Sequence, residues 1–217
     1  MIFIGIKKNE AMKTIFTILS AFICFGINAQ VPKDLDFVAP FSEGLAAIRQ
    51  GNDWAFIDDV GNIVINFRDD LYWNPDATTS YDDIRTVHNP KFSSGRCLVQ
   101  KMIDGIPVFG FIDTQGAMVI EPQFLNVRPF DNGWTTGIIF EKVHRGKNEF
   151  NLDIYEYKFH EVLMDVDGNI LEFLNRRYNI QMTKKRYKMP PIWSKVLNNK
   201  LIAVRTDNNW EIKKLEL

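Results

Sequence analysis

Three aspartates begin the same short motif, Asp-x-x-Gly, and each motif lies between two apolar runs. The motifs run from Asp58 to Gly61, from Asp113 to Gly116 and from Asp165 to Gly168. Carboxylates could act as general acids or calcium ligands, but an EF-hand loop with Asp165 third would place Leu163 first and Leu174 twelfth. Asp is favoured at the first position of a type I turn and Gly at the fourth. We therefore interpret the motifs as hairpin turns and predict no metal site.

The other reactive side chains do not form a recognisable catalytic set. His88, His144 and His160 are not spaced as metal ligands. Ser93 and Ser94 precede a glycine but lack the Gly-x-Ser-x-Gly pattern of a hydrolase elbow. Cys97 stands in an apolar, strand-like run, which indicates a buried, inert thiol. We predict no catalytic residue and no cofactor, and expect that the protein is not an enzyme.

A basic and aromatic stretch at residues 175–195 is one candidate binding region. Its candidate contact residues are Arg176, Arg177, Lys184, Lys185 and Arg186, interleaved with Tyr178, Tyr187 and Trp193. Such a mixture can hold an anionic polymer or a membrane surface. The alternative is a solvated connector whose lysines block unwanted strand pairing. The pattern does not decide between helix and strand for residues 171–188.

A second candidate binding region is the stretch 69–89, which separates two repeated segments. It carries Tyr72, Trp73 and Tyr81 beside several Asp and Asn residues. Exposed aromatic rings can stack on sugars or pack on a protein partner. This interpretation requires that the three rings are exposed.

A second motif, Phe-x-x-Gly, lies upstream of each Asp-x-x-Gly turn and opens a strand-like stretch. It runs from Phe41 to Gly44, from Phe92 to Gly95 and from Phe130 to Gly133. The repeating unit is therefore strand, turn, strand, Asp-x-x-Gly turn, strand. We expect units at about 36–68, 81–122 and 124–172, the third with an extra hairpin whose tip is near Gly146–Asn148.

A partial fourth unit, at about 192–217, closes the chain. Residues Ala203–Ile212 align without a gap on Ala47–Phe56, which places Trp210 on Trp54. No Asp-x-x-Gly motif follows. A degenerate last unit is expected where a repeat array must be capped.

These motifs resemble the WG-repeat family. The first copy is Phe41-Ser-Glu-Gly-Leu-Ala followed by Trp54-Ala-Phe-Ile-Asp, and in the second copy Phe109-Gly110 stands at the Trp-Gly position. The resemblance covers residues 36–170, with a weaker tail. It implies a β-repeat fold of a kind common in secreted bacterial proteins, and it does not imply a reaction.

The fold class that follows is all-β: about three and a half antiparallel hairpin units stacked as an open, twisted, solenoid-like array. Closure into a propeller-like ring is the alternative. A single unit cannot bury its apolar face, so neighbouring units must share a core. We predict Trp54 and Phe109 in that core, with the small Ala55 and Gly110 allowing close approach of a neighbouring chain.

The start of the chain reads as an export signal. Lys7, Lys8 and Lys13 precede an apolar run that is too short to span a bilayer, and Ala29 offers a small residue at the cut site. We expect removal of residues 1–29, a single domain at 30–217, and a location in the periplasm, on the cell surface or outside the cell. The formal net charge of −1 gives no reason to expect nucleic acid.

The sequence therefore favours an exported, non-catalytic binding or scaffold protein with a protein or glycan partner. One alternative is a hydrolase of extracellular polymers, which would need two carboxylates about 5–10 Å apart. The other is a structural module of the cell surface. Ligand identity and oligomeric state are left open.

Overall fold

The computed structural model describes residues 31–206 and 209–215. The fold below is that of the compact unit that begins at Pro32. The predicted signal, residues 1–29, lies outside the described residues.

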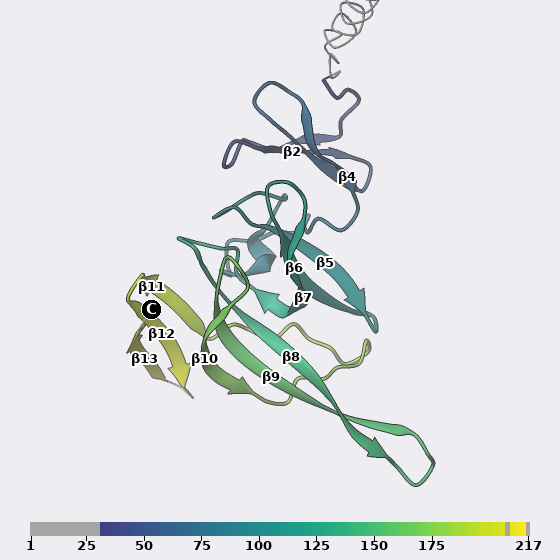
Figure 1. Cartoon of the computed structure of the whole chain (residues 1–217), viewed down its shortest axis with the longest axis vertical. Coiled ribbons are helices and arrows are strands. Elements are labelled where there is room, and N and C mark those ends of the chain that lie inside the picture. The colour runs from purple at the N-terminus through teal and green to yellow at the C-terminus, as the bar shows by residue number, and fades with distance from the viewer. Residues whose placement is uncertain (1–30, 207–208, 216–217) are drawn as a thin grey trace, which may run out of the picture. The chain divides into compact units, whose positions relative to one another are not determined.

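The described chain is all-β, as predicted, and its strands form three antiparallel sheets (Figure 1). The first has the order β1-β2-β3-β4: Phe37–Val38, Ala46–Gln50, Asp53–Ile57 and Ile63–Arg68. The second has the order β10-β9-β8-β7-β6-β5. In chain order these strands are β5 (Cys97–Ile103), β6 (Ile106–Ile112), β7 (Met118–Val127), β8 (Trp134–Lys147), β9 (Asp153–Asp165) and β10 (Ile170–Arg177). The third has the order β11-β12-β13: Ser194–Asn198, Leu201–Thr206 and Asn209–Lys214.

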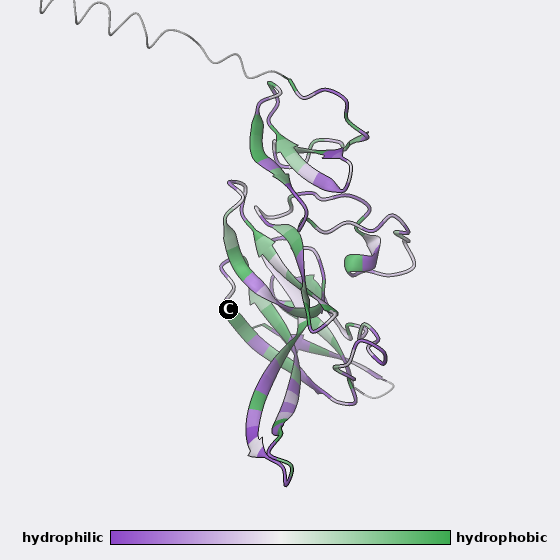
Figure 2. Ribbon diagram, turned by 90° about the vertical axis from the view of Figure 1, so that its right-hand side faces the viewer, coloured by the Kyte–Doolittle hydropathy of each residue, from purple (hydrophilic) through white to green (hydrophobic). Residues whose placement is uncertain are grey.

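No sheet closes into a barrel within the described strands, which is consistent with the predicted array of β-repeats. A short 3-10 helix, η1 (Ile84–Thr86), interrupts the insertion before β5. Hydrophobic residues are frequent along the strands of the sheets, whereas hydrophilic residues are frequent toward the end of the long β8–β9 hairpin (Figure 2).

The three Asp-x-x-Gly motifs form the predicted turns. In each, one carboxylate oxygen accepts the backbone N–H groups two and four residues later, as Asp58 does from Val60 and Asn62. Asp113 and Asp165 repeat this pattern. Each closing glycine has a positive φ, which a side chain would oppose. The aspartates are therefore explained by turn geometry.

The Phe-x-x-Gly motifs form two-residue hairpin-type turns and are linked to one another along the array. Ser42 Oγ donates to the carbonyl of Phe92 at 2.7 Å, and Ser93 Oγ donates to the carbonyl of Phe130 at 2.6 Å. The carboxylate of Glu43 accepts the N–H groups of Ser94 and Gly95. The second and third positions of the motif thus tie each turn to the next one.

The pairing register is the same in the first three units. The residue two after the Phe-x-x-Gly glycine pairs with the residue before the turn aspartate. The pairs are Ala46 with Ile57, Cys97 with Ile112 and Thr135 with Met164. The third unit therefore keeps the repeat geometry although its sequence retains little beyond the two turns.

The fourth unit also repeats the first. Arg205 pairs with Trp210 and Ala203 with Ile212, as Arg49 pairs with Trp54 and Ala47 with Phe56. The equivalence extends upstream, because Ser194 pairs with Val204 as Val38 pairs with Ile48. The gapless alignment of the last segment on the first is confirmed.

Trp54 and Phe109 are each 1% exposed, which confirms their predicted place in the core. Two other repeat residues are not buried. Phe41 is 54% exposed because the buried Phe92 and Phe130 pack on rings of a preceding unit, whereas no described unit precedes Phe41. Trp210 is 57% exposed because no described unit follows it. Phe41 and Trp210 thus occupy repeat positions, but their rings are exposed in the first and the last described unit.

The structure corrects one local expectation and decides one question that the sequence left open. The tip of the long hairpin is Asn148–Leu152, closed by Asn148 N–H donating to the Leu152 carbonyl, rather than Gly146–Asn148. Residues 171–188 are not helical: β10 continues to Arg177 and an irregular connector follows, with one turn at Thr183–Tyr187.

Candidate functional site

Two aromatic side chains of the 69–89 insertion are packing residues. Tyr72 lies edge-on to Phe109 with ring centroids 5.0 Å apart, and Trp73 lies edge-on to Trp54 at 5.5 Å. Neighbouring residues of an extended chain point to opposite sides, so these two join different core clusters. Desolvation raises the pKa of Tyr72 to about 12. Neither ring is the exposed platform that the sequence led us to expect.

Tyr81, the third aromatic residue of the insertion, is exposed. The guanidinium of Arg85 lies 3.4 Å from its ring centroid and covers one face. Arg85 is in turn bonded to Asp83, the N-cap of η1. Tyr81 is therefore held by its own segment, and the three aromatics do not form one surface.

The insertion is anchored by the buried Asp83. Its carboxylate accepts from the Arg85 side chain and from the Asn126 amide of β7, which also donates to the Pro190 carbonyl. Burial opposes ionisation of Asp83, but these donors outweigh it and hold the pKa of Asp83 below its ordinary value. One buried amide thus links the insertion, the central sheet and the connector after β10.

The structure gathers three of the five predicted basic residues at one pocket. Arg176, Arg177 and Arg186 line it together with Lys188. Lys184 and Lys185 are not among its lining residues. The Lys184 chain instead lies against the β5–β6 turn, so close that a Cβ on Gly105 would meet Lys184 Cδ at 2.9 Å.

This pocket, which we call the connector pocket, lies between the end of β10 and the connector at 178–193. Its volume is about 580 Å³. The lining residues are Arg176, Arg177, Tyr178, Asn179, Ile180, Gln181, Arg186, Lys188, Met189, Pro190, Pro191 and Trp193. Cationic and apolar side chains therefore share one concave wall, and none of its lining residues is acidic.

Arg177 is the one pocket cation whose charge is already paired. It is buried and its Nη1 lies 2.8 Å from Glu161 Oε2. It also donates to the Pro191 carbonyl at 2.8 Å and its guanidinium lies 3.7 Å from the Trp193 ring centroid. Arg177 therefore fixes the pocket wall, whereas Arg176, Arg186 and Lys188 are exposed and form no ion pair with any described residue.

Glu161 fixes the positions of Arg177 and of the backbone at Trp193 and Ser194. It is fully buried, and its second oxygen accepts the backbone N–H groups of Trp193 at 2.8 Å and Ser194 at 2.6 Å. Glu161 stands four residues before Asp165, the position of Trp54 and Phe109 in the first two units. Sequence reasoning missed it, although an acidic residue at the aromatic position of a repeat is a readable signal.

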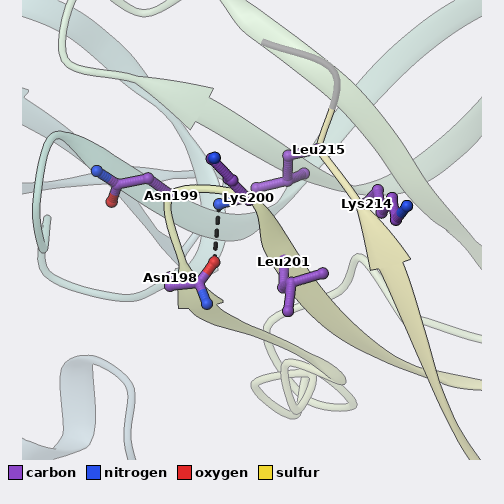
Figure 3. A pocket seen from close by; sticks show the side chains of 6 residues that line it. All are labelled: Asn198, Asn199, Lys200, Leu201, Lys214 and Leu215. Carbon is purple, nitrogen blue, oxygen red and sulfur yellow. Dashed lines mark hydrogen bonds between the residues drawn. The ribbon is translucent and has the colours of Figure 1, made fainter.

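Three other pockets are lined by fewer cationic side chains than the connector pocket. A pocket of about 860 Å³ beside the β11–β12 turn is lined by Asn198, Asn199, Lys200, Leu201, Lys214 and Leu215 (Figure 3). Its wall is described only as far as Leu215. Asp69 and Asp70 line two further pockets, and Arg68 bonds both carboxylate oxygens of Asp70.

Three further features of the described residues concern the free thiol, clusters that could bind a metal ion, and helices that could span a membrane. Cys97 is buried, and desolvation raises the pKa of its thiol to about 12. Residues 31–206 and 209–215 contain no cluster of three or more His, Cys, Asp or Glu side chains suited to a metal ion. Over the same residues no helix has the length and apolarity to cross a bilayer.

Comparison with known proteins identifies the repeat. The family model for the WG containing repeat matches residues 31–54 and 109–136. These segments include the first Phe-x-x-Gly turn up to Trp54 and the stretch from Phe109 to Trp134. Comparisons with curated proteins and with solved structures found no match. The repeat geometry and the family match together show that the chain contains WG-type repeats.

Proposed function

We propose that this WG-repeat protein is an exported, non-catalytic binding or scaffold module, and that its connector pocket holds a carboxylate-bearing glycan. The observation that supports this most directly is the pocket wall. Three exposed cations line the pocket together with apolar side chains, and no acidic side chain lines it. Such a site favours an anion that also presents apolar surface.

The chemistry of the wall suits an acidic sugar. A guanidinium can bind a carboxylate through two parallel N–H donors, so Arg176 and Arg186 provide the charge recognition. The half-buried Ile180 and Met189 and the ring of Tyr178 offer apolar surface to the C–H face of a sugar ring. Arg177 is held by Glu161, Pro191 and Trp193 before any ligand arrives, which reduces the ordering cost of binding.

The hydrolase alternative finds less support at this pocket. Polymer hydrolysis by paired carboxylates requires two acidic groups about 5–10 Å apart facing the substrate. The one carboxylate beneath the connector pocket, Glu161, is fully buried and committed to Arg177 and two backbone N–H groups. Binding without cleavage is therefore the function we propose.

A glycan-binding screen of the purified protein tests the proposal. Uronic-acid oligosaccharides should bind, and neutral oligosaccharides of the same length should bind at least about tenfold more weakly, which corresponds to roughly 1.4 kcal/mol. The double variant R176A/R186A should lose that preference. The matched control K184A/K185A removes two nearby positive charges outside the pocket lining and should retain it.

Equal binding of neutral and acidic glycans would contradict the proposal, as would an equal loss in the two double variants. Acidic peptides should be included as a separate arm. If they bind through Arg176 and Arg186 while the glycans do not, the pocket is a protein-docking site and the glycan assignment is wrong.

A further inference from the structure

Strand β13 has an outer edge that pairs with no other described strand. In each of the other three units that edge is filled. β4 pairs with β3, β7 with β6 and β10 with β9, in every case after an Asp-x-x-Gly turn. The fourth unit repeats the register of the first as far as β13, and the described residues 209–215 contain no such turn. An unpaired strand edge is a ready template for pairing with another chain.

The backbone groups that point outward from this edge follow from the β12–β13 register. Leu215 N–H donates to the Lys200 carbonyl, and the pairing continues without a bulge to Thr206 and Asn209. Backbone groups alternate in direction along an antiparallel strand. Residues 209, 211, 213 and 215 are therefore bonded to β12. The N–H and C=O groups of Trp210, Ile212 and Lys214 point away from it.

The side chains of this edge expose apolar surface on one face. Trp210 and Ile212 are 57% and 64% exposed, and they lie on the same side of the strand as Lys214. At the equivalent places in the first unit, Trp54 and Phe56 are buried in the core. Glu211 and Lys213 lie on the opposite side of β13 and form no ion pair with any residue that the structure describes.

We propose that two copies of this protein form a two-fold symmetric dimer in which β13 pairs antiparallel with β13 of the other copy, centred on Ile212. In this register Glu211 lies opposite the partner's Lys213, and this contact occurs twice because of the symmetry. Trp210 lies opposite the partner's Lys214, also twice, so that the lysine can rest on the indole face. The outward N–H and C=O groups of Trp210, Ile212 and Lys214 all find partners.

The neighbouring symmetric registers are less favourable. Centring on residue 211 would place two glutamates opposite each other, and centring on residue 213 would do the same with two lysines; like charges directly opposite are destabilising. Every register centred on a residue of β13 brings together N–H and C=O groups that point outward, so the charges decide among residues 211, 212 and 213. The charge sequence Glu-Ile-Lys is thus self-complementary about Ile212. A closed two-fold dimer also covers both edges and leaves no edge for further growth at this site.

Sedimentation and light scattering of the purified protein over a wide range of concentration test the proposal. The protein should sediment as a dimer. E211K places lysine opposite lysine and should weaken dimerisation about tenfold or more, and K213E should do the same with glutamates. The charge-swapped E211K/K213E should restore the dimer, because its strand is again complementary about Ile212.

Two further variants separate edge pairing from other causes. I212P removes an outward N–H while leaving every β12–β13 hydrogen bond possible, so it should give a folded monomer. R176A lies outside β13 and should remain dimeric. A monomeric wild-type protein, a larger oligomer, a dimer insensitive to E211K, or a charge swap that fails to restore the dimer would each overturn the proposal. None of these results depends on whether the connector pocket binds a glycan.

Discussion

At the scale of single residues, the most consequential position is Glu161. Where the first two units place Trp54 and Phe109 in the core, the third places a buried carboxylate. Its two oxygens connect Arg177 to the start of the fourth unit through the N–H groups of Trp193 and Ser194. A contact that is hydrophobic between the earlier units is thus replaced by a polar one, and the connector pocket is built on it.

Replacing Glu161 with Ala should destabilise the protein by about 3–5 kcal/mol, because Arg177 would remain buried without its partner. Chemical unfolding followed by fluorescence measures this loss. The paired variant E161M/R177M, which removes both charges, should recover much of the stability. E156A is the matched control: Glu156 forms an exposed pair with Arg145, and its loss should barely move the unfolding midpoint. An E161A protein as stable as E156A would contradict this account.

The lowered pKa of Asp83 predicts how the free energy of unfolding depends on pH. Burial disfavours the ionised form of Asp83, but the hydrogen bonds that its carboxylate accepts from Arg85 and Asn126 have the larger effect. The pKa of Asp83 is therefore lowered in the folded protein. The unfolded chain therefore takes up the proton first as pH falls. The stability that Asp83 contributes is fully present above the ordinary aspartate value of about 4 and is lost as pH falls below it.

Unfolding free energies measured from neutral pH down through this acid range should fall for the wild type. D83N should be less stable at neutral pH and should show a shallower slope in the acid range. D59N alters an exposed aspartate and serves as the control. Parallel slopes for wild type and D83N would show that Asp83 is not responsible.

At the scale of elements, the Trp-Gly position is explained by strand bulges. In the second unit, three residues of β7 bulge opposite Gly110, between the pairs Phe109–Phe124 and Phe111–Ile120. A Cβ at residue 110 would lie 2.4 Å from the Ile120 carbonyl oxygen. In the first unit the bulge opposite Ala55 contains two residues, between the pairs Trp54–Arg68 and Phe56–Ile65. The longer bulge brings the backbone of β7 so close to residue 110 that no Cβ fits there, which explains why this residue is glycine.

Gly110→Ala should therefore destabilise the protein by about 1–3 kcal/mol, because the clash is with backbone rather than with a flexible side chain. Ala55→Gly is the matched control at the same repeat position, and it should cost only about 0.5–1 kcal/mol from added flexibility. Thermal or urea unfolding compares the two. A larger loss in A55G than in G110A would reject the bulge explanation.

The sequence predicted best those features whose geometry is determined by residues close to one another along the chain. The Asp-x-x-Gly turns, the repeat register and the burial of Trp54 and Phe109 follow from spacing and strand alternation. The connector pocket could be predicted only in part, as a basic stretch. Its geometry depends on Glu161, which lies some distance away in sequence, and the burial of Tyr72 and Trp73 depends on which unit each ring meets.

At the scale of the whole array, identical motif positions differ in burial because they differ in neighbours. Phe92 packs on Phe56 and Phe130 packs on Phe111, each pair with ring centroids 4.7 Å apart. Phe41 begins the same motif, but the described chain offers it no preceding unit and it is exposed. The motif therefore encodes a contact that exists only where a unit precedes it.

This difference gives a prediction about the array. Phe92→Ala should cost about 3–5 kcal/mol, because it empties an aromatic contact between the first and second units. Phe41→Ala makes the same chemical change at the same motif position and should alter stability by less than about 0.5 kcal/mol, since its ring has no such contact to lose. Urea unfolding of the two variants beside the wild type measures both values. Similar losses would mean that the phenylalanine stabilises its own turn, and that stacking between units is not what the motif provides.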